Sequence, residues 1–154
     1  MLDMTVIGTA ALFPRADRAL AAVAATCAGS TILFDCGEGT QSAALRAGLN
    51  LARIDLIALT HYHGDHIYGL PGLLQTLGNC MSRTEPLYIT GPENIAADLS
   101  LILRLTGALP YELRLIEIPP EGLSMRSLFR NWPEEATLKR LKQNKKNNGL
   151  KLSV

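Results

Sequence analysis

The feature that most constrains this chain is a cluster of potential metal ligands in residues 59–72, LTHYHGDHIYGLPG. The chain has three histidines, and all of them fall within residues 61–66 together with one aspartate: His61, His63, Asp65 and His66. Imidazole nitrogens and carboxylate oxygens are common zinc ligands in proteins. The cluster therefore indicates a metal site rather than a set of ordinary loop histidines, and it calls for a fold that presents one short loop firmly.

The spacing within this loop favours two metal positions. Side chains alternate in direction along an extended segment, so His61 and His63 can face one divalent ion. Asp65 and His66 follow Gly64, whose permissive backbone allows the loop to reverse and aim these two side chains at a second point. Two neighbouring ions can stabilise the attacking and leaving oxygens of a phosphodiester. Asp65 is also suited to move a proton in such a reaction.

The loop follows an apolar run at residues 54–60, IDLIALT, which is typical of a strand buried on both faces. Strands and helices alternate after residue 50, which predicts an α/β domain. The alanine-rich run 20–26 fits a hairpin strand paired with 31–34, and it also fits a helix. Further strands are expected at 2–7, 87–90 and 113–118, and helices at 40–46, from 67 through Leu70, Leu73, Leu74 and Leu77, and at 92–106.

The block DCGEGT at residues 35–40 follows the expected strand 31–34. Two glycines in three positions predict a sharp turn or a close backbone approach. Asp35 fits either a turn-forming aspartate or a carboxylate that orients a neighbouring loop through hydrogen bonds. Thr40 is expected to cap the helix that runs to Arg46, with Gly48 as its stop.

Composition narrows the class of protein. A hydrophobic fraction of 47% and a charged fraction of 19% are those of a soluble globular chain. No apolar run approaches the ~18 residues that cross a membrane. The three cysteines, Cys27, Cys36 and Cys80, lack a paired spacing, which favours free thiols in a reducing compartment and argues against a cysteine zinc site. A cytoplasmic location is expected.

Charge is divided unevenly along the chain. Residues 1–122 contain seven arginines and no lysine against twelve acidic residues, whereas residues 123–154 contain eight basic residues against two glutamates. We therefore expect a folded domain over 1–122 and a divergent, lysine-rich, partly disordered tail over 123–154, with a weak helix at 134–142. Such a tail is usually a solvated end, although it could contact RNA phosphates.

Four blocks in order carry a family resemblance: VIGTAALFP, ILFDCGEGTQ, HYHGDHIYGLPGLL and LYITGP. Together they resemble the ribonuclease Z family of the metallo-β-lactamase superfamily over about residues 1–120. The resemblance implies a four-layer αββα sandwich, of which this chain would be the N-terminal half. It also implies a zinc-dependent endoribonuclease that removes the 3′ trailer from precursor tRNA. A homodimer is expected in addition.

The resemblance also implies roles for particular residues. His61 and His63 would bind a first zinc ion, and Asp65 and His66 a second. Asp65 would in addition be the catalytic proton acceptor or donor, and Asp35 would support the metal loops.

The family's remaining ligands come from a second half, whereas this sequence has no histidine after His66 and no aspartate after Asp98. A truncated chain that holds only part of the ligand set is therefore expected. Two alternatives stay open: a superfamily hydrolase acting on another ester, or a non-catalytic half-domain with an exposed apolar sheet face.

Overall fold

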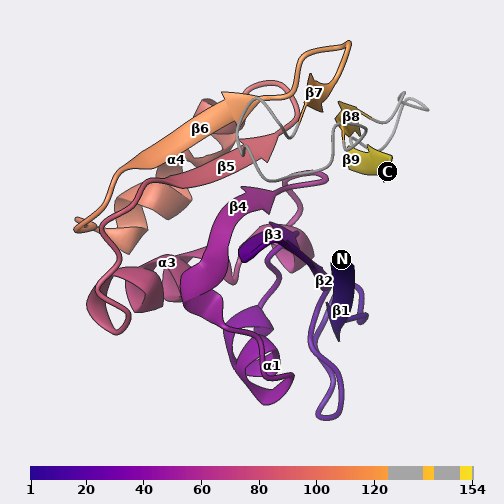
Figure 1. Ribbon diagram of the computed structural model, residues 1–154. Coiled ribbons are helices and arrows are strands. Elements are labelled where there is room, and N and C mark those ends of the chain that lie inside the picture. The colour runs from indigo at the N-terminus through magenta and orange to yellow at the C-terminus, as the bar shows by residue number, and fades with distance from the viewer. Residues whose placement is uncertain (125–136, 141–149, 154) are drawn as a thin grey trace.

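The computed structural model describes residues 1–124, 137–140 and 150–153. Its main element is a six-stranded sheet in the order β1-β2-β3-β4-β5-β6 (Figure 1). The first three strands pair antiparallel and β3 to β6 pair parallel. The strands are β1 Leu2–Gly8, β2 Ala22–Cys27, β3 Ser30–Phe34, β4 Ile54–Ala58, β5 Leu87–Gly91 and β6 Leu113–Glu117. The predicted α/β class is confirmed.

The alanine-rich run resolves as a strand. Residues Ala22–Cys27 pair with β1 on one side and β3 on the other, so the helical interpretation of 20–26 is wrong. The hairpin turn to β3 lies at Ala28 and Gly29, which both have positive φ, +50° and +89°. Hydrogen bonds to two neighbouring strands satisfy the backbone here, and this overrides the helix propensity of alanine.

The helices lie together along one face of the sheet (Figure 1). They are α1 Thr40–Arg46, α2 Gly64–Ile67, α3 Leu70–Asn79 and α4 Ile95–Thr106, with a 3₁₀ turn η1 at Leu51–Arg53. The predicted range 40–46 of α1 is confirmed, but its N-cap is Gly39, with φ +82°, and not Thr40. The predicted start of the next long helix at Pro92 is wrong, since α4 begins after Asn94. The predicted stop at Gly48 is consistent with its φ of +76°.

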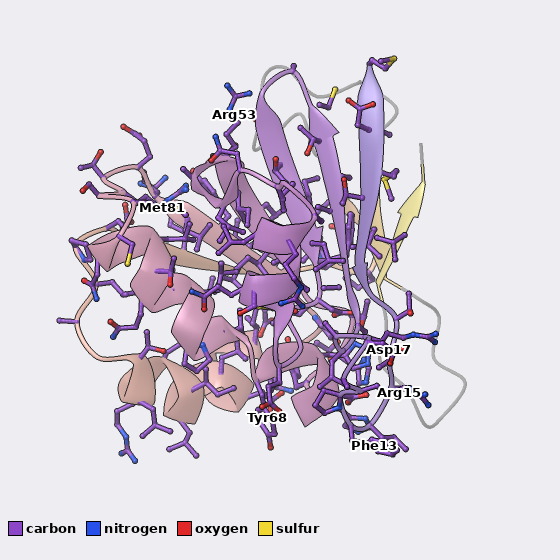
Figure 2. The ribbon with its side chains drawn as sticks, turned by 90° about the horizontal axis from the view of Figure 1, so that it is seen from below. Phe13, Arg15, Asp17, Arg53, Tyr68 and Met81 are labelled. Carbon is purple, nitrogen blue, oxygen red and sulfur yellow. The ribbon has the colours of Figure 1, made fainter. Side chains whose placement is uncertain are left out.

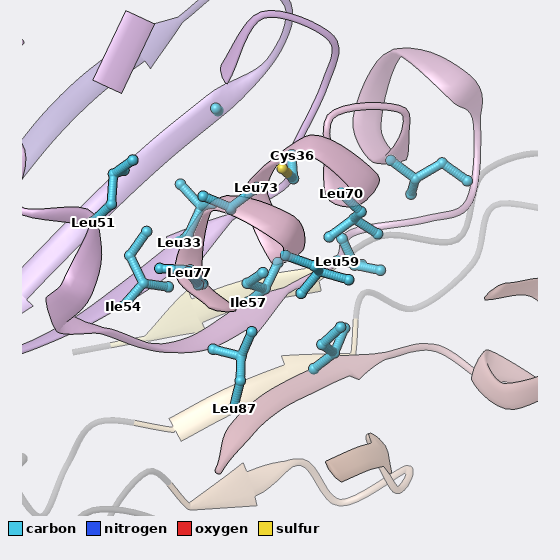
Figure 3. Packing of buried hydrophobic residues seen from close by; sticks show 14 of the residues in the cluster. Leu33, Cys36, Leu51, Ile54, Ile57, Leu59, Leu70, Leu73, Leu77 and Leu87 are labelled. Carbon is cyan, nitrogen blue, oxygen red and sulfur yellow. The ribbon is translucent and has the colours of Figure 1, made fainter. Parts of the chain in front are cut away.

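The core lies between this face and the helices (Figure 3). The predicted leucine stripe of α3 is confirmed, since all four leucines are fully buried: Leu70, Leu73, Leu74 and Leu77. They pack in one cluster with Leu33, Ile57, Leu59 and Ile89 from the strands. Because Leu59 directly follows β4, this packing anchors the point at which the histidine loop begins.

The opposite face of the sheet carries a second, smaller apolar cluster. At its centre Ile32, Leu56 and Ala58 are fully buried, and Ile118 and Leu123 also belong to it or pack against it. The expectation of an exposed apolar face is therefore wrong at the centre of the sheet. Exposed apolar side chains occur instead on the edge strand β1, where Met4 and Val6 are exposed.

A three-stranded antiparallel sheet contains β7 Leu123–Ser124, β8 Thr137–Arg140 and β9 Leu150–Ser153. The helix predicted over 134–142 is wrong at Thr137–Arg140, which are a strand, and the other residues of that range lie outside the described ones. The division of the chain at 122/123 and the partial disorder of the tail stay predictions. In the described part of the chain no helix has the length and apolar character needed to cross a membrane.

Candidate metal centre

The site lies where two parallel strands end side by side. Phe34 of β3 pairs with Ala58 of β4, and the N–H of Asp35 donates to the carbonyl of Ala58 at 3.0 Å. Asp35 and the histidine loop thus leave neighbouring strands at the same edge of the sheet. Loops at such an edge are held by a rigid scaffold while their side chains stay accessible.

The structure brings together the four residues singled out in the loop. The ring centroids of His61 and His63 are 4.6 Å apart, and those of His61 and His66 are 4.1 Å apart. Oδ2 of Asp65 lies 3.6 Å from Nε2 of His66. His63 is exposed, whereas the other three are partly buried. The loop therefore gathers three imidazoles and one carboxylate at one point on the surface.

The loop reverses by a helical turn and not through an unusual glycine conformation. His63 is the N-cap of α2, and the N–H of Tyr68 donates to the carbonyl of Gly64 at 2.9 Å. Gly64 does not have a positive φ. The expectation that the backbone freedom of Gly64 reverses the loop is wrong. Glycine instead avoids a steric clash at this position, because a Cβ there would lie 2.3 Å from the Tyr68 ring.

The backbones of the two loops touch each other. The N–H of Cys36 donates to the carbonyl of His66 at 2.7 Å, and the N–H of Gly69 donates to the carbonyl of Cys36 at 2.8 Å. A Cβ on Gly37 would meet the carbonyl oxygen of Asp65 at 2.2 Å, and one on Gly69 would meet that of Gly37 at 2.2 Å. The close approach predicted for the DCGEGT block is confirmed.

Asp35 orients both ends of the histidine loop. It has a φ of +56°, which is uncommon for a residue with a side chain. Its carboxylate accepts the backbone N–H of Thr60 at 2.8 Å and contacts Nδ1 of His66 at 2.8 Å. The loop-orienting interpretation of Asp35 is therefore the correct one.

Neighbouring histidines have pKa values shifted in opposite directions. The hydrogen bond to Asp35 raises the pKa of His66, against the effect of burial. Burial and the adjacent His66 and His63 rings lower the pKa of His61. The cluster therefore disfavours the doubly protonated, charged form of His61, which keeps that ring available as a neutral ligand.

Asp65 is held in its ionised form by a distant backbone group. Burial alone would raise the pKa of Asp65, but the hydrogen bond from Leu12 and the nearby His66 outweigh burial and lower it. The N–H of Leu12 lies 3.1 Å from Oδ2 of Asp65. Sequence reasoning missed this contact, because a backbone donor carries no signal in residue type.

Thr60 is the other residue that sequence reasoning missed. Its hydroxyl lies 2.9 Å from Asp35 and 3.0 Å from Nδ1 of His61. In the sequence, only its position directly before His61 pointed to a role for Thr60 in the site. We refer to these six residues as the site cluster: Asp35, Thr60, His61, His63, Asp65 and His66.

The site cluster fits part of a zinc ligand set. Nδ1 of His66 is bonded to Asp35 and Nδ1 of His61 to Thr60, which leaves Nε2 of each ring for a metal, as is common in metal sites. Zinc in proteins normally has three or four protein ligands. Among the described residues no group of three or more His, Cys, Asp or Glu side chains is arranged to hold an ion. The donor types suit zinc, but the described residues fall short of a complete set.

Comparison with known proteins gives matches to the metallo-beta-lactamase superfamily and to proteins named Ribonuclease Z. The family model of the metallo-beta-lactamase superfamily matches residues 22–100. Ribonuclease Z of Agathobacter rectalis is 47% identical over 118 residues, which are 77% of this chain and 39% of that protein. Ribonuclease Z of Lachnoclostridium phytofermentans is 44% identical over 118 residues, 77% of this chain and 38% of that protein. The chain thus spans about two fifths of the length of these relatives.

Solved structures agree on the fold. The short form of human tRNase Z is 29% identical with a TM-score of 0.75, and the match covers 99% of this chain and 65% of that one. A diphosphatase of the PhnP family has a TM-score of 0.73 at 17% identity, covering 99% and 63%.

Proposed function

This chain belongs to the metallo-beta-lactamase superfamily, and on that premise we propose that it is the N-terminal part of a ribonuclease Z-type endoribonuclease. Its reaction would be zinc-dependent hydrolysis of the phosphodiester that joins the 3′ trailer to precursor tRNA. The identity of 42–47% with several proteins named Ribonuclease Z supports this substrate. The observation that carries the proposal is the gathering of three imidazoles and Asp65 at the ends of β3 and β4.

Each member of the cluster has a role in this proposal. His61 and His63 would hold one zinc ion, and Asp65 and His66 a second. When bound, zinc supplies Lewis acidity toward the phosphate oxygens. Asp65 is kept ionised by the amide of Leu12, so its carboxylate can accept a proton during hydrolysis.

The proposal extends to the setting of the reaction. Precursor tRNA is the partner that follows from the relatives' names. A homodimer and a cytoplasmic location, the latter predicted from the unpaired cysteines, remain part of the proposal.

Cleavage of precursor tRNA tests the reaction directly. The chain is incubated with a 3′-extended tRNA and zinc or manganese, beside Asp65→Ala. We expect little cleavage from the chain alone. We expect a clear gain when the part of Agathobacter rectalis ribonuclease Z that this chain does not match is supplied as a second polypeptide. Equal cleavage by the wild-type and Asp65→Ala complexes would remove Asp65 from the mechanism.

A second candidate function is a non-catalytic half-domain. It is favoured by the lack, among the described residues, of a group of three or more ligands arranged around one ion. Zinc content per purified chain discriminates between the two. About zero zinc, with no gain from the added polypeptide, would support the half-domain. Two tightly held ions per chain would contradict it, and a panel of small phosphate esters, sulfate esters and lactones would then test other hydrolase substrates.

A further inference from the structure

One threonine connects the buried carboxylate to the first imidazole of the site cluster. The hydroxyl of Thr60 lies 2.9 Å from each carboxylate oxygen of Asp35 and 3.0 Å from Nδ1 of His61. The backbone N–H of Thr60 donates to Oδ1 of the same carboxylate at 2.8 Å. The Thr60 side chain is therefore held on two sides at once.

The number of available protons determines the direction of these hydrogen bonds. A threonine hydroxyl has one proton to give, and an ionised carboxylate can only accept. If Thr60 gave its proton to His61, its oxygen would face those of Asp35 at 2.9 Å with no proton between them, which is repulsive. Thr60 therefore donates to Asp35, and its oxygen accepts from His61.

His61 must then carry its proton on Nδ1, because a neutral imidazole has a single N–H. The same holds for His66, whose Nδ1 donates directly to Oδ2 of Asp35 at 2.8 Å. We infer that Thr60 is a positioning residue through which Asp35 sets the tautomer of His61. One carboxylate thus fixes two imidazoles, His66 by direct contact and His61 through the hydroxyl of Thr60. Each ring, in its neutral form, is left with a lone pair on Nε2.

The consequence for zinc rests on the proposed function, whereas the tautomer itself does not. A ring held in the Nδ1–H form needs no tautomer change and little reorientation before Nε2 binds a metal. Outer partners of this kind typically contribute about tenfold to a hundredfold in metal affinity. Thr60 is therefore expected to contribute to zinc binding without being a ligand.

The test is nitrogen NMR of the full metal-free chain labelled with ¹⁵N-histidine, since protonated and unprotonated ring nitrogens have distinct chemical shifts. With three histidines in the chain, the spectrum is simple to assign. In the wild type, His61 is expected to be protonated on Nδ1. Thr60→Val keeps the branched shape but removes the hydroxyl, so His61 should lose this fixed tautomer while His66 keeps it. Thr60→Ser should restore the wild-type pattern.

A matched control is Thr90→Val. Thr90 is fully buried, whereas Thr60 is partly buried, and the hydroxyl of Thr90 has no hydrogen-bond partner among the described residues, so all three histidines should be unchanged. Competition with a chromophoric chelator should show that Thr60→Val weakens zinc binding about tenfold and that Thr60→Ser does not.

Three results would overturn the inference: a wild-type His61 protonated on Nε2, an unchanged His61 tautomer in Thr60→Val, or a Thr60→Ser spectrum like that of Thr60→Val. If Thr60→Val does not fold, the wild-type and Thr60→Ser spectra decide. Neither readout involves RNA. A failure to cleave precursor tRNA would therefore count against the proposed function and leave the tautomer assignment standing.

Discussion

Two polar clusters, each containing a buried charged residue, lie at opposite ends of the parallel strands, and they differ in where their hydrogen bonds lead. The site cluster is at the carboxyl ends of β3 and β4. The second, which we call the Arg83 cluster, is at the amino ends of β4 and β5 and consists of Arg83, Asp55 and Tyr111. Figure 2 shows Tyr68, just beyond the histidine loop, at one end of the molecule and Arg53, just before β4, at the other.

The Arg83 cluster is closed within the chain. The guanidinium donates to the carbonyls of Ile54, Glu85 and Pro86, each at 2.8 Å. It also lies 3.6 Å from Oδ1 of Asp55 and 5.8 Å from the centroid of the Tyr111 ring. The guanidinium thus ties the start of β4 to the segment before β5.

The inner side of the site cluster is hydrogen-bonded to other residues of the chain, whereas its outer side is accessible to a ligand. Asp35 and Thr60 occupy Nδ1 of His66 and of His61, whereas Nε2 of His66 lies 3.6 Å from Oδ2 of Asp65. A polar group whose hydrogen bonds are all made within the chain contributes to folding. A group that the chain orients, but that still has an unused donor or acceptor atom, can bind a ligand. This difference separates a structural cluster from a functional one even though both contain buried charge.

The largest effect on folding is expected from Arg83→Met, which keeps the apolar stem but removes the guanidinium. Three carbonyls lose a charged donor, and that of Ile54 is fully buried, so the free energy of unfolding should fall by about 3 kcal/mol. Urea unfolding of the full chain measures this fall. Zinc affinity per folded chain should stay at the wild-type value, since the site is at the other end of the strands.

The matched control for Arg83 is Arg114→Met. Arg114 pairs with Glu112 at 2.8 Å, but both side chains are solvent-exposed, so little loss is expected. An equal loss of stability in Arg83→Met and Arg114→Met would contradict the structural role of the Arg83 cluster.

The second-largest loss of stability is expected from Gly69→Ala. A Cβ there would lie 2.2 Å from the carbonyl oxygen of Gly37, and backbone atoms cannot move aside easily. Stability should fall by about 2 kcal/mol, together with zinc binding, because the two site loops are forced apart. Gly72→Ala is the control, because its nearest neighbour is the Gln41 side-chain oxygen at 3.1 Å. Wild-type behaviour in both variants would contradict the close loop packing.

Asp65→Asn, in the site cluster, should weaken zinc binding and leave stability almost unchanged, which is the opposite of what is expected for Arg83→Met. The variant keeps the size of the side chain but loses its charge, so zinc affinity should fall by about tenfold or more while unfolding changes by less than about 1 kcal/mol. Chelator competition and urea unfolding measure the two quantities. Asp3→Asn, at an exposed position of β1, is the control. A loss of stability without a loss of zinc would make Asp65 a structural residue.

The smallest effect concerns Tyr111, whose pKa burial raises from 10.0 to about 12. The unfolded chain then releases this proton first, so stability present below pH 10 should be lost as the pH rises toward 12. Tyr111→Phe should abolish this dependence. It should also cost about 1 kcal/mol at pH 7 through the lost hydrogen bond to the Leu74 carbonyl. Tyrosinate absorbance checks the assignment, since the wild type should show a late ionisation that Tyr111→Phe lacks, whereas the same late ionisation in both proteins would contradict it.

Much of the fold was predictable because local patterns carry it. The leucines of α3, the apolar run of β4 and the hairpin turn at Gly29 depend on side-chain period and turn chemistry, which act over a few residues. The errors arose where tertiary contacts decide. Ala22–Cys27 is a strand because strands lie on both sides of it, and the Tyr68 ring occupies the space that a side chain at position 64 would need.

The sequence by itself determined which donor atoms are available, since three imidazoles and a carboxylate within six residues already indicate metal chemistry. Only the tertiary structure decided how those donors are held. Asp35 is 31 residues from His66 and Leu12 is 53 residues from Asp65, and neither contact has a local pattern. They form because parallel strands end in register at one edge of the sheet, which places loops distant in sequence within hydrogen-bond reach.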